Sequence, residues 1–423
     1  IVPIFGGLFY IMFGGNRLSS RTRRRMQGLE RKMEEVLRPD FQADELLPIG
    51  EDAVHQARYL EHMAHCPVYG NTVTEYFSLG EFCFARMIEE LKKAEHYIFV
   101  EYFIVEEGEM WNAILDILKE KAAQGVDVRL LYDDIGSMFT LPRDYARDLE
   151  AKTGIKCCVF NPFVPILTIR LNNRDHRKIM VIDGKVGFTG GINLADEYIN
   201  QKLRYGHWKD TAILLKGEAV WSMTVMFLTM WEYTRDVEED YRRFRPDKLP
   251  PEAAQGAGYY VQPYADNPLD EEAVGEAVYL NLINKAERYV YAMTPYLIIS
   301  DSVNTALCNA AKSGVDVRII TPHIPDKALV FELTRSHYES LLEAGVQIFE
   351  YTPGFVHAKV MVTDDCCGVV GSINLDYRSM FLHFEDGVWL CEAPCIRDIR
   401  KDFEDTLSVC QRISLRQWRH LNP

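Results

Sequence analysis

The residues most suited to chemistry stand in a short stretch that begins at His176. Lys178 follows two residues later, Asp183 five residues after that, and a Gly-Gly-x-Asn sequence ends at Asn193. An imidazole can act as a nucleophile or as a general acid and base, and an ammonium group stabilises a negatively charged oxygen. The stretch therefore carries the groups needed to act on an anionic substrate.

The chain contains the same arrangement a second time. His357, Lys359 and Asp364 have the same spacing, and a Gly-Ser-x-Asn sequence ends at Asn374. A single His-x-Lys sequence in a strand carries little weight, but two copies with matching downstream sequences are not expected by chance. Two imidazoles on opposite sides of one phosphorus atom, with two lysines and two asparagines around it, would suit a phosphodiester without a metal ion. One histidine would attack, and the other would protonate the leaving alkoxide.

A β-hairpin is predicted to position each set of residues. In the first copy an apolar run, 179–182, is followed by an Asp-Gly pair that favours a tight turn, and then by a second run, 186–190. Alternate residues of a strand share a face, so His176 and Lys178 are expected to point the same way.

The register of each hairpin follows from its loop. With Gly184 and Lys185 as a two-residue loop, the histidine and the lysine face the asparagine and the small residue two positions before it. The expected pairs are His176 with Asn193, Lys178 with Gly191, His357 with Asn374, and Lys359 with Ser372.

The two aspartates are expected to have a structural role, although they belong to the repeated pattern. Asp183 lies about 23 Å from His176 along an extended strand, at about 3.3 Å per residue, which is too far to contact the same small group. Asp183 and Asp364 would instead fix the hairpin turns or pair with a buried partner. The acid that orients each imidazole must then come from elsewhere, and Asp210 and Glu385 are the candidates.

The duplication extends beyond the two hairpins. Segments that begin at Lys93 and Lys285 resemble each other, and each is followed by a helix-like stretch and a GVDVR sequence. Strands that alternate with helices indicate an α/β fold. We expect two repeated α/β sandwich units packed as a pseudo-dimer, residues 41–236 and 271–423, joined by a charged, Pro- and Gly-rich linker, 237–270.

The N-terminal segment, residues 1–40, is expected to be associated with a membrane. Residues 1–15 are apolar and the arginines of 17–25 follow, which is typical of a membrane-spanning helix with a cytoplasmic cationic flank. We interpret it as the end of such a helix with its beginning missing, because in a signal peptide the charges precede the apolar part. A second apolar stretch, from Gly217, contains glutamates and is predicted to be a buried or partly membrane-facing helix.

Composition limits the classes of function. The 423 residues are 48% hydrophobic, enough for a large core, and the net charge of −15 argues against nucleic-acid binding, since such proteins usually present a basic surface. The ten cysteines include no Cys-x-x-Cys pair and indicate reduced, mostly buried thiols in a protein that faces the cytosol.

At its repeated motifs the chain resembles the phospholipase D superfamily, whose signature is His-x-Lys-x-x-x-x-Asp followed by Gly-Ser/Gly-x-Asn, used twice. Within that superfamily it is similar to the bacterial cardiolipin synthases in stretches such as NNRDHRKIMVIDGKVGFTGGINLADEY and YESLLEAGVQIFEYTPGFVHAKVMVTDD. The likeness runs from about Thr72 to Ile399. It implies the catalytic motif residues His176, Lys178, Asp183, His357, Lys359 and Asp364, with Asn193, Asn374, Gly191 and Ser372 binding phosphate or supporting them. Asp210 and Glu385, the candidate orienting acids, complete the supporting set.

The resemblance implies a transphosphatidylation between two phosphatidylglycerol molecules, which yields cardiolipin and glycerol through a phosphatidyl-histidine intermediate. By analogy His176 is the nucleophile and His357 the acid and then the base, with no cofactor, nucleotide or metal. The implied location is the bacterial inner membrane, with the catalytic units facing the cytoplasm. An acidic protein that collects anionic lipid needs a local basic patch, and residues 17–25 with Arg170, Arg174 and Arg177 are expected to form it.

Other functions would use the same motif residues. A phospholipase D-type hydrolase, a phosphodiesterase nuclease, or a phosphatidyltransferase with another alcohol acceptor such as ethanolamine or serine would differ in the acceptor. A non-catalytic membrane scaffold would be expected to have lost a motif residue, and none is lost. The sequence indicates neither the acceptor nor the oligomeric state.

Overall fold

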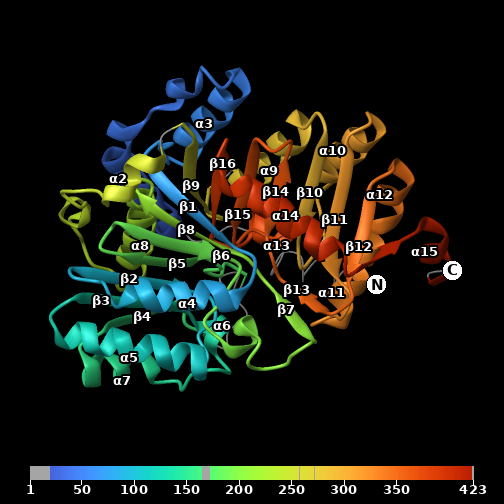
Figure 1. The fold of residues 1–423 in the computed structure, drawn as a ribbon. Helices are drawn as coiled ribbons and strands as arrows, with labels where there is room; N and C mark the ends of the chain where they lie inside the picture. The colour runs from blue at the N-terminus through green and yellow to red at the C-terminus, as the bar shows by residue number, and fades with distance from the viewer. Residues whose placement is uncertain (1–19, 164–171, 257, 271, 422–423) are drawn as a thin grey trace.

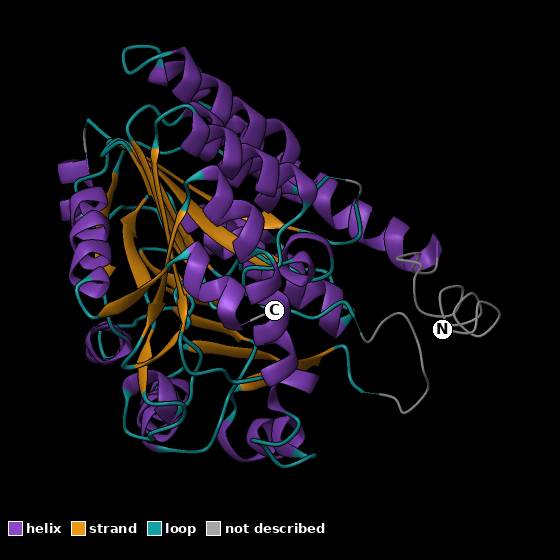
Figure 2. Cartoon of the chain, turned by 90° about the vertical axis from the view of Figure 1, so that its right-hand side faces the viewer, coloured by secondary structure: helices purple, strands orange, loops and turns teal. Residues whose placement is uncertain are grey.

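Two β-sheets lie side by side at the centre of the molecule (Figure 1), a computed structural model that describes residues 20–163, 172–256, 258–270 and 272–421. The first sheet has the strand order β1-β8-β6-β5-β2-β3-β4, and the second has the order β17-β12-β11-β10-β14-β15-β16-β9. Read from β1 and from β9, the two orders match strand by strand, with β17 added at the far edge of the second sheet. Helices lie outside the strands (Figure 2), so the predicted pair of repeated α/β units is confirmed.

The first unit is built around a parallel strand pair. β2 and β3 run parallel with Tyr97 opposite Asp127, and α5 makes the crossover between them. Residues of β2 are buried on both faces, as expected for a central strand covered by helices. Up to residue 256 the strands are β1 (Thr72–Phe77), β2 (Tyr97–Tyr102), β3 (Asp127–Asp133), β4 (Lys156–Phe160), β5 (Lys178–Ile182), β6 (Val186–Gly190), β7 (His207–Lys209) and β8 (Ala212–Gly217), and the helices are α2 (Ser20–Leu37), α3 (Glu51–Met63), α4 (Gly80–Leu91), α5 (Glu109–Ala123), α6 (Asp134–Ser137), α7 (Tyr145–Thr153) and α8 (Val220–Arg235), with short 3-10 turns at Arg38–Asp40, Ala43–Leu46, Asp196–Ile199, Tyr241–Phe244 and Pro251–Gly256.

The second unit repeats the same plan. β10 and β11 run parallel with Tyr289 opposite Asp316, and α10 crosses between them. From residue 258 the strands are β9 (Tyr260–Asp266), β10 (Tyr289–Met293), β11 (Asp316–Pro322), β12 (Gln347–Tyr351), β13 (Gly354–Val356), β14 (Val360–Thr363), β15 (Cys367–Gly371), β16 (Glu385–Cys391) and β17 (Cys410–Ile413), and the helices are α9 (Val274–Lys285), α10 (Asp301–Lys312), α11 (Ala328–Ser336), α12 (Tyr338–Ala344), α13 (Tyr377–Phe381), α14 (Cys395–Leu407) and α15 (Leu415–Leu421).

The segment expected to be a linker, 237–270, requires a correction, because its second half forms β9. This strand pairs antiparallel with β16 along its whole length and completes the second sheet. Val261 and Tyr264 are fully buried, and this burial outweighs the turn-forming composition of the surrounding residues. The second sheet therefore begins at Tyr260, earlier than the expected boundary at 271.

α8 is buried between the units, in agreement with one of the two predictions made for it. Residues 220–232 are all buried, and Phe227 stacks on Phe99 of β2 with ring centroids 4.5 Å apart. Its Glu232 accepts a hydrogen bond from Lys32 at 2.7 Å. No helix in the described part of the chain is long and apolar enough to cross a membrane, and the predicted membrane segment at 1–15 lies outside the described residues.

The cysteines are all free thiols, as predicted. Six of them are buried and four are half-buried. They contribute to the packing of the core and form no covalent link between the units.

Candidate active site

Two short segments carry the histidines across the boundary between the units. The main-chain NH of His176 donates to the carbonyl of Phe384 at 2.9 Å. In the other direction β13 pairs with β7, and the NH of His357 donates to the carbonyl of Lys209 at 2.7 Å. Each histidine is thus held by the main chain of the other unit.

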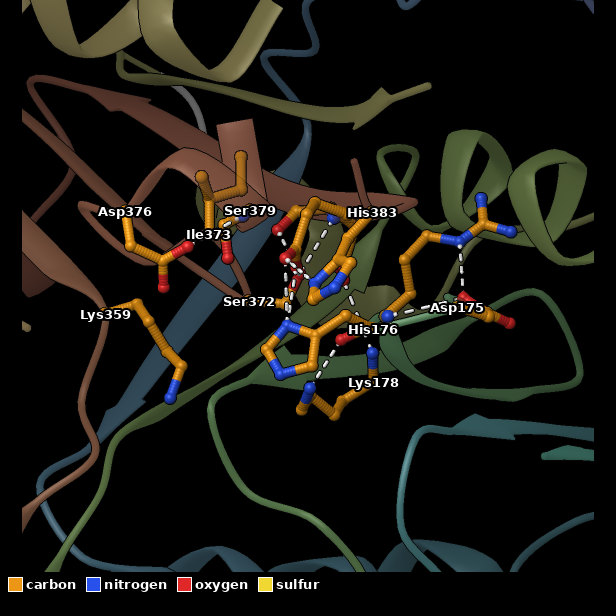
Figure 3. Close-up of polar contacts among 12 residues, drawn as sticks. Asp175, His176, Lys178, Lys359, Ser372, Ile373, Asp376, Ser379 and His383 are labelled. Atoms are coloured by element: carbon orange, nitrogen blue, oxygen red, sulfur yellow. Dashed lines mark hydrogen bonds and ion pairs between the residues drawn. The ribbon is translucent and has the colours of Figure 1, made fainter. Parts of the chain in front are cut away.

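The first half-site is centred on His176 (Figure 3). Its Nδ1 lies 2.9 Å from both carboxylate oxygens of Glu385, which begins β16 in the second unit. Ser372 donates from its hydroxyl to the Oε2 atom of the same carboxylate. Lys178 contacts the carbonyl of His176, and the ring of Phe103 packs edge-on with its centroid 5.1 Å from the imidazole.

The second half-site is centred on His357. Its Nδ1 lies 2.7 Å from Asp210 Oδ2, an acid of the first unit, and 2.7 Å from the Nζ atom of Lys359. Asp210 Oδ1 accepts from the main-chain NH of Thr211 at 2.8 Å. A Cβ atom at Gly191 would lie 2.1 Å from this Oδ1, so only glycine leaves room for the carboxylate.

The orienting acids are therefore exchanged between the units. Asp210 and Glu385 are the two acids that the sequence proposes, and the structure brings each against the imidazole of the other unit. A carboxylate that accepts the Nδ1 proton fixes the tautomer and leaves the Nε2 lone pair available. Neither half-site has its acid without the other unit.

The pKa values of the site follow from burial. Burial lowers the pKa of His176 to about 3 and that of His357 to about 4, so both imidazoles are neutral at pH 7. It also lowers the pKa of Lys178 to about 8 and that of Lys359 to about 7. Burial alone would raise the pKa of Asp210, but His357 and Lys359 outweigh it and hold this acid in the ionised form. Neutral imidazoles beside ionised carboxylates are the state that a histidine nucleophile requires.

The motif aspartates lie at the opposite end of each hairpin from the histidines. Asp183 accepts three hydrogen bonds of 2.7–2.8 Å from the main-chain NH groups of residues 95–97, and Asp364 accepts three of 2.7–2.9 Å from those of 287–289. These carboxylates fix the starts of β2 and β10 to the hairpin turns. The resemblance counts them among the catalytic motif residues, but their contacts are those of structural residues, as the strand length predicts.

The hairpin register differs from the predicted one by one residue. Ile182 pairs with Val186 and Thr363 with Cys367, so each loop has three residues rather than two. The first two residues of each loop have positive φ angles, between 54° and 65°, which accommodates the extra residue. The predicted direct pairs are therefore wrong: His176 with Asn193, Lys178 with Gly191, His357 with Asn374, and Lys359 with Ser372.

The two motif asparagines differ in whether their amide oxygens already accept a hydrogen bond from the protein. Asn193 accepts from the main-chain NH of Ile104 at 3.0 Å and donates to the hydroxyl of Tyr198 at 2.7 Å. Asn374 is buried, and its amide oxygen has no hydrogen-bond partner among the described residues. Asn193 thus supports the first unit internally, and Asn374 remains available to a substrate.

Arg174 and Arg177 do not form the expected basic patch. Arg174 binds both carboxylate oxygens of Asp133 at 2.8–3.0 Å, and Arg177 forms an ion pair with Glu101 at 2.7 Å. Both arginines are buried, because the segment before β5 runs through the interior towards the second unit. Arg170 lies outside the described residues.

His383 joins the first half-site without having been predicted. Its ring centroid lies 5.5 Å from that of His176, and its Nδ1 lies 3.6 Å from Glu385 Oε1. One ligand atom from each of these three residues falls within 4.8 Å of the others, so they could hold a metal ion. In the first repeat the equivalent position, two residues before Asp210, is occupied by Trp208. This difference between the repeats is the feature of the sequence that could have indicated a special role for His383.

Duplicated α/β units that meet at a pair of His-x-Lys hairpins place the chain in the phospholipase D class of proteins. A family model described as "Cardiolipin synthase, PLD-like domain" matches residues 87–231 and 279–407. The chain belongs to this family.

Known proteins of similar sequence support the same grouping. A cardiolipin synthase of Geobacillus kaustophilus is 37% identical over 99% of this chain and 82% of its own length. An uncharacterized protein of Streptococcus mutans serotype c is 46% identical over 97% of this chain and 88% of its own length. Among solved structures, a phosphatidylserine synthase of Haemophilus influenzae has a TM-score of 0.64 at 15% identity, covers 85% of this chain and 92% of its own, and supports the fold alone.

Proposed function

We propose that the protein is a phosphatidyltransferase that makes cardiolipin from two molecules of phosphatidylglycerol. The observation that carries the proposal is the reciprocal pairing of His176 with Glu385 and of His357 with Asp210. Two oriented, neutral imidazoles at one site suit a two-step displacement at phosphorus, and membership of the cardiolipin synthase family indicates phospholipid substrates.

In the first step His176 attacks the phosphorus of one phosphatidylglycerol. Nδ1 keeps its proton, which stays hydrogen-bonded to the Glu385 carboxylate, while Nε2 forms the new phosphorus–nitrogen bond. The bond to the glycerol oxygen breaks, and His357 supplies the proton that leaves with glycerol. The negative charge of the bound phosphate and the carboxylate of Asp210 favour the protonated form of His357 that this step requires. The roles of the two histidines are assigned by the resemblance, since both imidazoles are oriented in the same way.

The lysines and Asn374 stabilise the phosphoryl oxygens. Lys178 and Lys359 come from opposite units and lie close enough to influence each other's charge, so one phosphate can contact both. Figure 3 shows Lys178 and Lys359 beside His176. Asn374 adds an amide oxygen that accepts no hydrogen bond from any described residue.

In the second step the terminal hydroxyl of another phosphatidylglycerol attacks the intermediate. His357 now accepts the hydroxyl proton, the phosphorus–nitrogen bond breaks, and His176 is regenerated as cardiolipin leaves. No cofactor or nucleotide is needed, because the energy of the original phosphodiester is retained in the intermediate. We place this reaction at the cytoplasmic face of the bacterial inner membrane, where both substrates reside.

Product analysis tests the proposal. The purified protein in detergent is incubated with phosphatidylglycerol alone, without nucleotide or added metal, and the lipids are resolved by mass spectrometry. We expect cardiolipin and free glycerol. Phosphatidic acid alone would make the protein a hydrolase, and no reaction with phosphatidylglycerol would overturn the proposed substrate.

A further inference from the structure

The first half-site contains a buried polar atom that the proposed mechanism leaves unused. The Nδ1 atom of His383 is buried and makes no hydrogen bond within the described part of the chain. It points to the carboxylate of Glu385 at 3.6 Å, beyond hydrogen-bond distance, while Nδ1 of His176 lies 2.9 Å from the same oxygen. Figure 3 shows the imidazoles of His176 and His383 close together.

We propose that His176, His383 and Glu385 form a binding site for Zn²⁺ and that the bound ion inhibits the enzyme. Two imidazoles and one carboxylate with an open fourth position are a frequent ligand set for this ion. Ligand atoms of a tetrahedral zinc site lie about 3.4 Å apart, as Zn–N and Zn–O distances of about 2.1 Å require. The separations of 2.9 and 3.6 Å therefore need only small side-chain adjustments.

Inhibition follows from the tautomer of His176 and rests on the proposed function. Without metal, Nδ1 carries the proton towards Glu385 and Nε2 carries the attacking lone pair. Zn²⁺ binds the Nδ1 lone pair, so the ring proton moves to Nε2. The imidazole remains neutral and no proton is released, but Nε2 no longer has a lone pair with which to attack phosphorus.

The local charge is compatible with a cation. Lys178 opposes its binding, but the carboxylate of Glu385 is a direct ligand, and Asp376 lies within electrostatic range of both His383 and Glu385. The side chains of His176 and His383 are 8% and 12% exposed, and that of Glu385 is fully buried, so the ion would be largely enclosed by protein. The imidazole ligands favour Zn²⁺ over Mg²⁺, which prefers oxygen.

The second half-site cannot form the same metal site. Its histidine and acid, His357 and Asp210, are paired in the same way, but Trp208 stands where the first half-site has His383. The Trp208 ring centroid lies 5.4 Å from that of His357, and its indole offers no lone pair to a metal. One Zn²⁺ ion per chain is therefore expected at the active site.

Zinc binding is measured directly on the purified full chain, by titration against a competing colour-forming chelator. We expect one ion per chain and a loss of affinity of at least about 10-fold in His383→Asn. His323→Asn is the matched control, because His323 also pairs through Nδ1 with a glutamate, Glu350, at 2.8 Å but has no second histidine beside it among the described residues. His383→Gln is a second variant, and the melting temperatures of all variants are compared.

Inhibition is then measured as cardiolipin formation with and without Zn²⁺, each rate divided by that variant's own metal-free rate. We expect Zn²⁺ to inhibit the unmodified chain and the His323→Asn variant, EDTA to restore the rate, and Mg²⁺ to have no effect. His383→Asn and His383→Gln should resist the ion. Zinc binding that is absent, or equal in both His383 variants and the unmodified chain, would overturn the inference.

The two proposals fail in distinguishable ways. A chain that makes cardiolipin but shows no His383-dependent zinc binding would retain the proposed function and lose the metal site. A chain that forms no cardiolipin in metal-free buffer but binds Zn²⁺ through His383 would lose the proposed function and retain the metal site.

Discussion

The two half-sites perform matching tasks with different residues. In the first, the acid is Glu385 and the small motif residue is Ser372, which donates to that acid. In the second, the acid is the shorter Asp210, and Gly191 leaves the space that its carboxylate occupies. The half-site with the longer acid thus has serine as its small residue, and the half-site with the shorter acid has glycine. In both, the carboxylate accepts a hydrogen bond from a second donor in addition to its histidine.

The source of that second donor also differs. Glu385 receives it from a side chain, the Ser372 hydroxyl, whereas Asp210 receives it from the main-chain NH of Thr211. A side-chain donor can be removed by mutation and a main-chain donor cannot. The comparison teaches that the second half-site depends on close packing and the first on hydrogen bonding.

Loss of either histidine should have the largest effect. His176→Ala and His357→Ala are each expected to lower the rate of cardiolipin formation about 10⁴-fold or more. The two histidines act as one catalytic unit, so the loss of either one removes the contribution of both. The measurement is the initial rate with phosphatidylglycerol, and melting curves serve as the folding control. Substantial product from either folded variant would mean that one half-site is sufficient.

The packing of the second half-site is tested by Gly191→Ala. A Cβ atom 2.1 Å from Asp210 Oδ1 must displace the carboxylate and, through it, His357. We expect the rate to fall about 100-fold, as misplacement by about 1 Å can cost. Ser372→Ala in the first half-site removes the hydrogen bonds of this hydroxyl to Glu385 and to the main chain of Asp386 without a clash, and a fall of about 10-fold is expected. Equal rates for the two variants would contradict the contrast between packing and hydrogen bonding.

The pH profile should be displaced from that of ordinary histidines. The neutral form of the nucleophile, His176, is lost only as the pH falls through about 3, so the acid limb of kcat/KM should lie below pH 5 rather than near 6.5. The charges of Lys359 and Lys178 are lost as the pH rises through about 7 and about 8, so the rate should decline there. An acid limb near pH 6.5 would show that the imidazoles are not desolvated in the free enzyme.

The motif aspartates should produce the smallest effect on chemistry. Asp183→Asn weakens three main-chain hydrogen bonds of a buried carboxylate and is expected to cost about 2 kcal/mol of unfolding free energy, measured by denaturant titration. Asp364→Asn, at a more exposed turn, should cost less. A variant of unchanged stability that has lost all activity would refute the structural role.

The sequence predicts the local parts of the site and misses those that depend on three-dimensional packing. Strand length alone predicts that Asp183 cannot reach the histidines, and the repeat alone indicates two similar units. The one-residue error in register arose because the positive φ angles of the hairpin loops cannot be read from an Asp-Gly pair. The exchange of Asp210 and Glu385 between the units is a property of how the sheets meet, which no local pattern contains.

Buried charge was the other source of error. Arg174 and Arg177 were expected at the surface because isolated arginines usually are, but each has an acidic partner from another strand. The role of His383 depends on its distance from Glu385, and the contrast with Trp208 becomes informative only when the two repeats are aligned on their acids.

The assignment of His176 as the nucleophile and His357 as the general acid and base is tested most directly by trapping the covalent intermediate. A phosphatidyl ester of p-nitrophenol needs no acid for its leaving group, so it separates nucleophile from acid. We predict that His357→Asn releases a burst of one p-nitrophenolate per chain and carries the phosphatidyl group on the peptide that contains His176, whereas His176→Asn does neither. A burst from His176→Asn with the adduct on His357, or no adduct in either variant, would contradict the assignment.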